Sequence, residues 1–240
     1  MRVASMFSGG KDSNYALSWA IRQGWTVSHL VTVYSERPDS YMYQTSGLEL
    51  TELAAQAIGI PQVKVWTSGE EGSEVQDLQV VLARIVEDED VEGLVSGALK
   101  SNYQKDRLDR VCGELKIKSF TPVWHKDPEE HLRTMLKDGY EIIFVGASAE
   151  GLGPQWLGRR LDLKAIEELL KIRDKFAINI DGEGGEFETI VLDAPHYKKR
   201  VVIDSSEPSW HRDNGRLIIH KAHLEDKPGP AVAVPKDSNV

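Results

Sequence analysis

Short apolar runs alternate with segments of helical periodicity along the first half of the chain. The apolar runs occupy residues 3–7, 27–33, 63–66 and 93–96, a typical length for buried strands. Between them, apolar residues recur at the spacing of one helix face, as at Ala16, Leu17, Ala20 and Ile21. Glycine follows the first two of these helices, at Gly24 and Gly59, where it commonly ends a helix. This alternation predicts a parallel sheet with helices on both faces.

The pattern is less regular in the second half. Helices are expected at residues 103–115, 128–137 and 161–175, and short strands at 141–145, 187–192 and 201–203. Two glycine-rich stretches, 147–160 and 179–186, lack periodicity, and long irregular loops inside compact domains usually carry function. We therefore expect three parts in order along the chain: a first domain over residues 1–123, a smaller α+β domain over 124–225, and a flexible tail over 226–240.

Composition places the chain among soluble globular proteins and removes several classes of function. Of its 240 residues, 40% are hydrophobic and 28% are charged, which is ordinary for a protein with a buried core. A single cysteine excludes an intramolecular disulfide and a zinc site built on several cysteines. The net charge of −9 argues against bulk binding to DNA or RNA. Since no apolar stretch has the length of a signal peptide or a membrane span, we expect a cytoplasmic protein without a membrane partner.

The motif that carries chemistry lies where the first strand leads into the first helix, and it reads Ser8-Gly9-Gly10-Lys11-Asp12-Ser13. A helix N-terminus presents unpaired N–H groups and the positive end of the helix dipole, which together attract a phosphate. The two glycines allow the backbone to approach that phosphate closely, and the serine hydroxyls can donate hydrogen bonds to it. Lys11 adds a cation, so we expect nucleotide binding by all six residues and catalysis by Lys11 and Asp12. Asp12 is a poor neighbour for phosphate alone, so we expect it to bind Mg²⁺ or to cap the helix.

The spacing of this motif separates it from two common nucleotide loops. It lacks the G-x-x-x-x-G-K-[ST] order of a Walker A loop and the third glycine of a dinucleotide-binding fingerprint. An ordinary Gly-Gly turn with a polar helix cap is the simpler alternative. The motif resembles the pyrophosphate loop of the PP-loop ATPases, which cleave ATP between the α and β phosphates. That resemblance implies an adenine nucleotide alpha hydrolase-like (HUP-type) α/β fold for about the first 120 residues.

Three further segments resemble one branch of that superfamily, the diphthine–ammonia ligases. They are the segments at residues 39–44 (DSYMYQ), 96–104 (SGALKSNYQ, continued by Arg107) and 182–189 (GEGGEFET). The first two follow predicted strands, and in open parallel sheets ligands lie beyond the carboxyl ends of the strands. The resemblance implies that Gly97 contacts the nucleotide. It also implies substrate binding by Tyr43, Gln44, Ser101, Tyr103, Gln104 and Arg107.

These segments also have simpler interpretations. Arg107 can form a surface ion pair, and the tyrosines of segment 39–44 can pack a loop onto the edge of the sheet. The glutamates Glu183, Glu186 and Glu188 can belong to a solvated hairpin turn. In the alternative that we favour, these three form an acidic pocket wall that binds a cationic substrate. Glu183 and Glu186 are the candidates for binding or deprotonating ammonium, and the sequence does not distinguish them.

The resemblance implies an ATP-dependent ligase that uses Mg²⁺. Such an enzyme amidates diphthine, the modified histidine of translation elongation factor 2, with ammonia from ammonium. The reaction proceeds through an acyl-adenylate and yields diphthamide, AMP and pyrophosphate. The elongation factor is then the protein partner, and a homodimer is left open.

The sequence leaves two other functions as alternatives. A PP-loop enzyme that modifies tRNA is disfavoured by the single Cys112, because thiolation commonly uses paired cysteines, and by the acidic charge. An adenine-nucleotide sensor without catalysis needs neither Lys11-Asp12 nor the glutamate cluster. Cys112 itself is expected to be a packed core thiol, and the seven histidines show no metal-ligand spacing.

Overall fold

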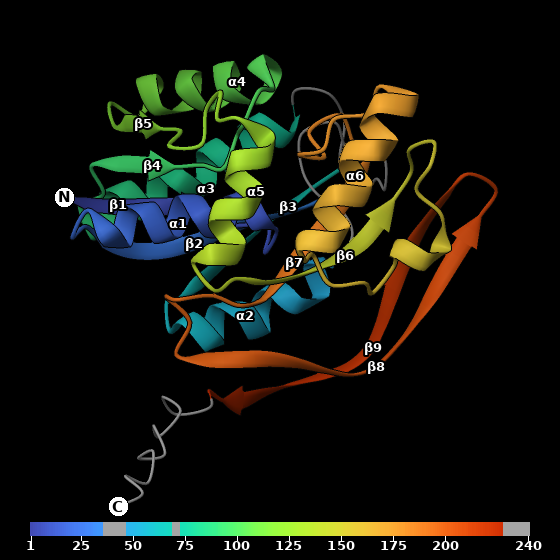
Figure 1. Cartoon of the computed structure of the whole chain (residues 1–240). Coiled ribbons are helices and arrows are strands. Elements are labelled where there is room, and N and C mark those ends of the chain that lie inside the picture. The colour runs from blue at the N-terminus through green and yellow to red at the C-terminus, as the bar shows by residue number, and fades with distance from the viewer. Residues whose placement is uncertain (36–46, 69–72, 228–240) are drawn as a thin grey trace, which may run out of the picture.

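The computed structural model describes residues 1–35, 47–68 and 73–227 of the chain, which form two β-sheets with helices packed on them (Figure 1). The expected substrate residues Tyr43 and Gln44 lie outside these residues, as does the expected tail from residue 228 onward. None of the helices in the described ranges has both the length and the apolar character needed to cross a membrane.

The first sheet is parallel and has the strand order β3-β2-β1-β4-β5. Its strands are β1 (Arg2–Met6), β2 (Thr26–Ser35), β3 (Gln62–Thr67), β4 (Gly93–Val95) and β5 (Lys118–Phe120). The helices that connect them are α1 (Lys11–Arg22), α2 (Thr51–Ile58), α3 (Ser73–Glu89) and α4 (Asn102–Glu114). The predicted order of strands and helices is confirmed, with β5 as an added strand too short to show a pattern in the sequence.

Helices cover both faces of this sheet, as predicted. Leu78 and Leu82 of α3 and Val111 of α4 pack with strand residues on one face. Ala16 and Ala20 of α1 pack on the other face with Val3 and Val95. Cys112 lies in the α3 and α4 layer and is 1% exposed, so the expectation of a packed core thiol is confirmed. Burial raises the pKa of this thiol to about 11, which makes it a poor nucleophile.

Local sequence accounts for where the helices begin and end. Gly59 takes φ +77° after α2, a left-handed conformation that glycine adopts without strain. Helix α5 (Pro128–Lys137) has proline in its first turn, and its N-cap Asp127 accepts a hydrogen bond from the Glu130 N–H at 2.9 Å. Both ends of α5 coincide with the range predicted from the sequence.

The second sheet is antiparallel and has the order β7-β6-β9-β8. Its strands are β6 (Glu141–Ala147), β7 (Phe187–Asp193), β8 (Lys199–His211) and β9 (Asn214–Asp226), and α6 (Leu163–Phe176) packs beside α5. The predicted strand at 201–203 is only a small part of β8, and β9 was not predicted. Most residues of this long hairpin are exposed or half-buried, so no alternation of buried and polar positions marks it in the sequence.

One hydrophobic core extends across both sheets. It joins Leu17, Leu30 and Leu50 of the first half to Phe144 and Ile190 of the second, and Trp156 packs edge-on against Phe144. The shared core fixes β7 beside the N-terminus of α1, and this arrangement positions the candidate site.

Candidate functional site

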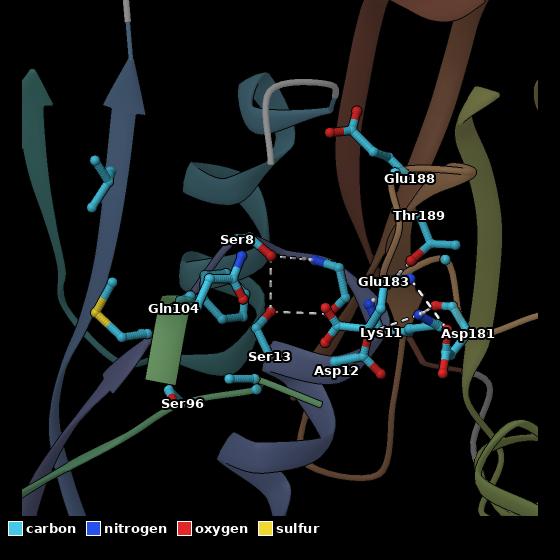
Figure 2. A pocket seen from close by; sticks show the side chains of 18 of the residues that line it. Ser8, Lys11, Asp12, Ser13, Ser96, Gln104, Asp181, Glu183, Glu188 and Thr189 are labelled. Carbon is cyan, nitrogen blue, oxygen red and sulfur yellow. Dashed lines mark hydrogen bonds and ion pairs between the residues drawn. The ribbon is translucent and has the colours of Figure 1, made fainter. Parts of the chain in front are cut away.

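A cavity of about 580 Å³ lies where the carboxyl ends of β1 and β4 meet the segment that leads into β7 (Figure 2). Its volume is in the range of about 300–1,000 Å³ that is usual for small-molecule sites. The lining includes most of the nucleotide residues predicted from the sequence, one predicted substrate residue of α4 and two of the three predicted glutamates: Ser8, Gly10, Lys11, Asp12, Ser13, Gly97, Gln104, Glu183 and Glu188.

Backbone and side-chain contacts from strand β7 hold the glycine loop in place. The carbonyl of Gly9 accepts hydrogen bonds from the Val191 N–H at 2.9 Å and from the Asn14 side-chain amide at 2.8 Å. Gly9 itself has φ +77°, and a Cβ on it would lie 2.6 Å from Cδ1 of Ile190. Gly9 therefore shapes the loop from outside the cavity, whereas Ser8, Gly10 and Ser13 form the cavity wall.

Hydroxyl groups hold the two ends of the loop together. The Ser8 hydroxyl accepts from the Gly10 N–H at 3.3 Å and lies 3.3 Å from the Ser13 hydroxyl. The Ser13 hydroxyl also donates to the Gly10 carbonyl at 3.0 Å. These bonds fix the loop at the N-terminus of α1, the end of a helix that attracts anions.

Lys11 places a buried cation at the wall of this cavity, and its residue is 4% exposed. Its ammonium group donates to Asp12 Oδ2 at 2.7 Å and to the backbone carbonyl of Asp181. It also lies 5.5 Å from the centre of the Phe187 ring. The backbone N–H of Lys11 donates to the Thr189 hydroxyl at 3.2 Å, so β7 fixes this residue as well.

Asp12 is held as a carboxylate by neighbours from both halves of the chain. Burial opposes its charge, but the Lys11 cation and the hydrogen bond from His131 outweigh burial and hold the pKa of Asp12 below its ordinary value. His131 lies on the buried face of α5, and its Nε2 is 3.1 Å from Asp12 Oδ1. Because an ionised carboxylate only accepts hydrogen bonds, Nε2 is the donor.

Asp181 and Glu183 connect the acidic segment to the loop between β4 and α4. Asp181 is 1% exposed, and its carboxylate accepts from Lys100 Nζ at 2.8 Å and from the Glu183 N–H at 3.2 Å. Glu183 Oε1 accepts from the Leu99 N–H at 2.7 Å. Burial raises the pKa of Glu183, the Leu99 N–H opposes that shift, and the negative charges of Asp12 and Asp181 add to it.

The other two glutamates are placed differently. Glu186 is absent from the cavity lining, because its carboxylate accepts from both nitrogens of Asn179 at 2.9 and 2.7 Å and from the Gly184 N–H at 2.8 Å. Glu188 lines the cavity, and Figure 2 shows it set apart from the group formed by Lys11, Asp12, Asp181 and Glu183.

Gly97 lies against the start of α1. A Cβ at Gly97 would come within 2.6 Å of the Asp12 carbonyl carbon and the Ser13 nitrogen. Only glycine allows the chain after β4 to pass this close to the nucleotide loop, which is a reason for glycine that the sequence pattern does not reveal.

The remaining predicted residues of this region lie on α4. Ser101 caps α4 by accepting from the Gln104 N–H at 3.3 Å, and Gln104 lines the cavity. Tyr103 and Arg107 are absent from the lining, and the Arg107 guanidinium stacks 3.2 Å from the centre of the Tyr103 ring.

Sequence reasoning missed three polar residues of this group: Asp181, His131 and Lys100. Asp181 lies within the glycine-rich stretch 179–186, so its position was the available signal. His131 carries no such signal, since a histidine on the apolar face of a helix is normally a packing residue. Among the described residues, no group of three or more His, Cys, Asp or Glu side chains is placed to hold a metal ion.

Comparison with known proteins gives a consistent result along the whole chain. Residues 1–119 match the family described as diphthamide synthase N-terminal domain, and residues 127–224 match the diphthamide synthase C-terminal domain. The proteins named diphthine–ammonia ligase from Mus musculus and Homo sapiens are each 35% identical to this chain, over 95% of its length and 94% of theirs. The protein of that name from Schizosaccharomyces pombe is 33% identical over 95% of this chain and 40% of its own.

Among solved structures, a chain described as a predicted subunit of tRNA methyltransferase from Methanocaldococcus jannaschii aligns over 81% of this chain and 98% of its own. Its TM-score of 0.42 and identity of 16% are too low to bear on function.

Proposed function

Because the chain belongs to the diphthine–ammonia ligase family, we propose that it amidates diphthine with ammonia at the expense of ATP. The products are diphthamide, AMP and pyrophosphate. One observation carries the proposal: a buried lysine cation at a helix N-terminus and a carboxylate whose pKa is raised by burial line the same cavity. The first suits a polyphosphate and the second suits an amine.

The cavity offers complementary surfaces for the parts of ATP. Its apolar lining on one side comprises Met6, Val31, Val33 and Leu108, which suits an adenine ring. The phosphates then lie at the N-terminus of α1, beside the hydroxyls of Ser8 and Ser13 and the Lys11 cation. Negative charge develops on the departing pyrophosphate in the transition state, and the preorganised Lys11 cation and N–H dipoles stabilise it there.

Asp12 is the candidate ligand for Mg²⁺, and the donor set around it fits an ion that arrives with the nucleotide. Mg²⁺ in nucleotide sites is usually held by one or two carboxylates together with phosphates and water. Asp12 remains ionised and lines the cavity, and each of its oxygens accepts one hydrogen bond, from Lys11 and from His131, which leaves lone pairs for an ion without a cluster of protein ligands. Such an ion, when bound, neutralises phosphate charge.

The diphthine carboxylate attacks the α phosphate and forms an acyl-adenylate, and ammonia then displaces AMP. Diphthine also carries a quaternary ammonium group, which is attracted to the negative charge of the acidic segment. We place Glu188 near that group, because it lines the cavity apart from the Lys11 cluster. Gln104 at the cavity wall, with Ser101, Tyr103 and Arg107 on the same helix, completes the proposed binding surface for the substrate.

The partner of this reaction is a large protein, the diphthine-bearing translation elongation factor 2, and we place the reaction in the cytoplasm. The alternative of a tRNA-modifying enzyme is not favoured by the relatives, which are named diphthine–ammonia ligases. An adenine-nucleotide sensor is not favoured either, since its function requires no acidic wall opposite the nucleotide loop.

The test is incubation of the protein with labelled ATP, ammonium and elongation factor 2 that carries diphthine. We expect AMP and pyrophosphate only when all components are present, together with amidation of the modified histidine in the mass spectrum. ADP as the product, or no turnover with this substrate, contradicts the proposal.

A further inference from the structure

The three glutamates of segment 182–189 look equivalent in the sequence but have different surroundings in the structure. Glu186 accepts three N–H donors from Asn179 and Gly184 and therefore closes the turn of its own segment. It does not line the cavity, so it is unsuited to meet a substrate.

Glu183 is held at the cavity wall from two directions. Its Oε1 accepts from the Leu99 N–H in the loop between β4 and α4, and its own N–H donates to the buried carboxylate of Asp181. Figure 2 shows its side chain beside Lys11, Asp12 and Asp181, while Glu188 lies apart from them. Glu183 is therefore the glutamate nearest to the loop where the acyl-adenylate is expected.

We propose that Glu183 binds the ammonium ion and takes its first proton, whereas Glu186 and Glu188 do not. This assignment rests on the proposed function and deepens it by naming one group for the second half-reaction.

Charge and burial around Glu183 suit this role. Asp12 and Asp181 each have a lysine partner, at 2.7 and 2.8 Å, whereas the Glu183 carboxylate accepts from a backbone N–H and so offers its negative charge to a small cation. Burial raises its pKa, and the Leu99 N–H and the Lys11 cation oppose that shift without cancelling it, so this carboxylate accepts a proton more readily than an exposed one. Lys100 neutralises Asp181 at 2.8 Å and so keeps the buried group compatible with folding.

In the proposed step, ammonium transfers one proton to the Glu183 carboxylate and becomes ammonia. The nitrogen lone pair forms the C–N bond at the acyl carbon, and the bond from that carbon to the AMP oxygen breaks, with its electron pair leaving on AMP. The surplus proton on nitrogen and the proton held by Glu183 then pass to solvent.

The test compares two nucleophiles in a Glu183→Gln variant. Glutamine keeps an oxygen that accepts from the Leu99 N–H but removes the charge and the base. Hydroxylamine is uncharged near pH 7 and needs no prior deprotonation. We expect kcat/KM for ammonium to fall about 100-fold or more, while hydroxamate formation from hydroxylamine and the KM for the diphthine-bearing factor stay near the wild-type values. Glu167→Gln, at an exposed position of α6, makes the same change of charge away from the cavity and is the control.

Three other outcomes of this experiment contradict the assignment of Glu183. Equal loss with both nucleophiles shows a structural or adenylation role and overturns the assignment. A raised KM for the diphthine-bearing factor with ammonium kinetics unchanged shows that Glu183 holds the quaternary ammonium group, which also overturns it. If the wild-type protein forms no AMP with either nucleophile, the proposed function fails, and the assignment fails with it.

Discussion

At the scale of single residues, Lys11 combines the most roles. It is buried, it pairs with Asp12, and it spans the gap between the nucleotide loop and the carbonyl of Asp181. Each contact fixes the ammonium group where the charge of a leaving pyrophosphate is expected.

Replacement of Lys11 by alanine is expected to lower the rate of AMP formation by about 100- to 1,000-fold, the usual effect of removing one preorganised charge or donor. The far-UV circular dichroism spectrum should stay native, since the helix and sheet cores do not depend on this side chain. Lys171→Ala, at an exposed position of α6, is the matched control. Near-normal turnover by the Lys11 variant refutes the role given to the loop.

His196 predicts how stability depends on pH. Both of its ring nitrogens are buried and have no hydrogen-bond partner in the described part of the chain. Burial, aided by the charges of Lys227 and Arg22, lowers its pKa to about 3. Below about pH 6.5 the unfolded chain binds a proton at His196, whereas the folded chain binds it only near pH 3. The free energy of unfolding therefore decreases as the pH falls from about 6.5 to about 3.

The slope attributed to His196 is about 1.4 kcal/mol per pH unit between roughly pH 6 and pH 4. His196→Phe keeps an aromatic ring beside Tyr140 and Tyr197 and removes the titrating group, so it should flatten the curve. Urea denaturation at several pH values measures this. His211→Phe, at an exposed position of β8, is the control, and parallel curves for wild type and His196→Phe would count against the argument.

Site residues could be predicted from the sequence where the residue type and its position between two elements indicate the same chemistry. Two glycines, a lysine and an aspartate between a strand and a helix indicate an anion site, and the structure places Lys11 and Asp12 at a cavity. His131 and Lys100 were not predictable, because their roles exist only through partners that are distant in sequence. Glu186 is the opposite case. Its sequence pattern is typical of a site residue, but its carboxylate accepts hydrogen bonds from three neighbouring N–H groups.

At the scale of elements, the contact between the end of β4 and the start of α1 sets the shape of the nucleotide loop. Gly97→Ala would place a methyl group 2.6 Å from backbone atoms of Asp12 and Ser13, so the helix start has to move. We expect a loss of about 1–3 kcal/mol in the free energy of unfolding and weaker nucleotide binding.

The chain offers a close control for this substitution. Gly113 lies near the end of α4, and among the described residues nothing outside the neighbouring backbone of its own helix lies within 4 Å of the place that an alanine methyl group would take there. Alanine at this position is expected to stabilise the helix by about 0.5–1 kcal/mol. Chemical denaturation and nucleotide titration of the two variants measure both effects. Equal stability of the two variants contradicts the close-packing argument.

The elements differ in how well the sequence predicted them. Helix α5 was predicted to the residue, because proline and an aspartate cap mark its start. The hairpin of β8 and β9 was largely missed, because most of its residues are exposed or half-buried. Its strands are stabilised by pairing with each other along their whole length, and that pairing leaves little trace in local sequence.

At the scale of the whole molecule, the cavity lies between two sheets that share one core. A nucleotide that touches both the α1 loop and the segment before β7 binds only the assembled fold. Binding should therefore stabilise the entire chain in a single transition.

ATP at about 100 times its dissociation constant is expected to add about 2.7 kcal/mol to the stability of the folded state. For a chain of this length, that corresponds to a rise of about 5–10 °C in Tm. Differential scanning fluorimetry measures the shift, and Lys11→Ala should reduce it. A biphasic transition in which only one phase moves would show that the two sheets unfold independently.

The hydrogen bond from Val191 to Gly9 and the contact of Gly9 with Ile190 have a consequence for how such a protein can change over evolutionary time. A side chain at position 9 needs both a left-handed backbone and the space that Ile190 fills. We therefore expect a change in the nucleotide loop to require a matching change in strand β7. If β7 were replaced by the strand of a distant relative, the nucleotide loop would lose the surface on which it packs. The same loss is expected if the first half were fused to a different substrate-binding domain.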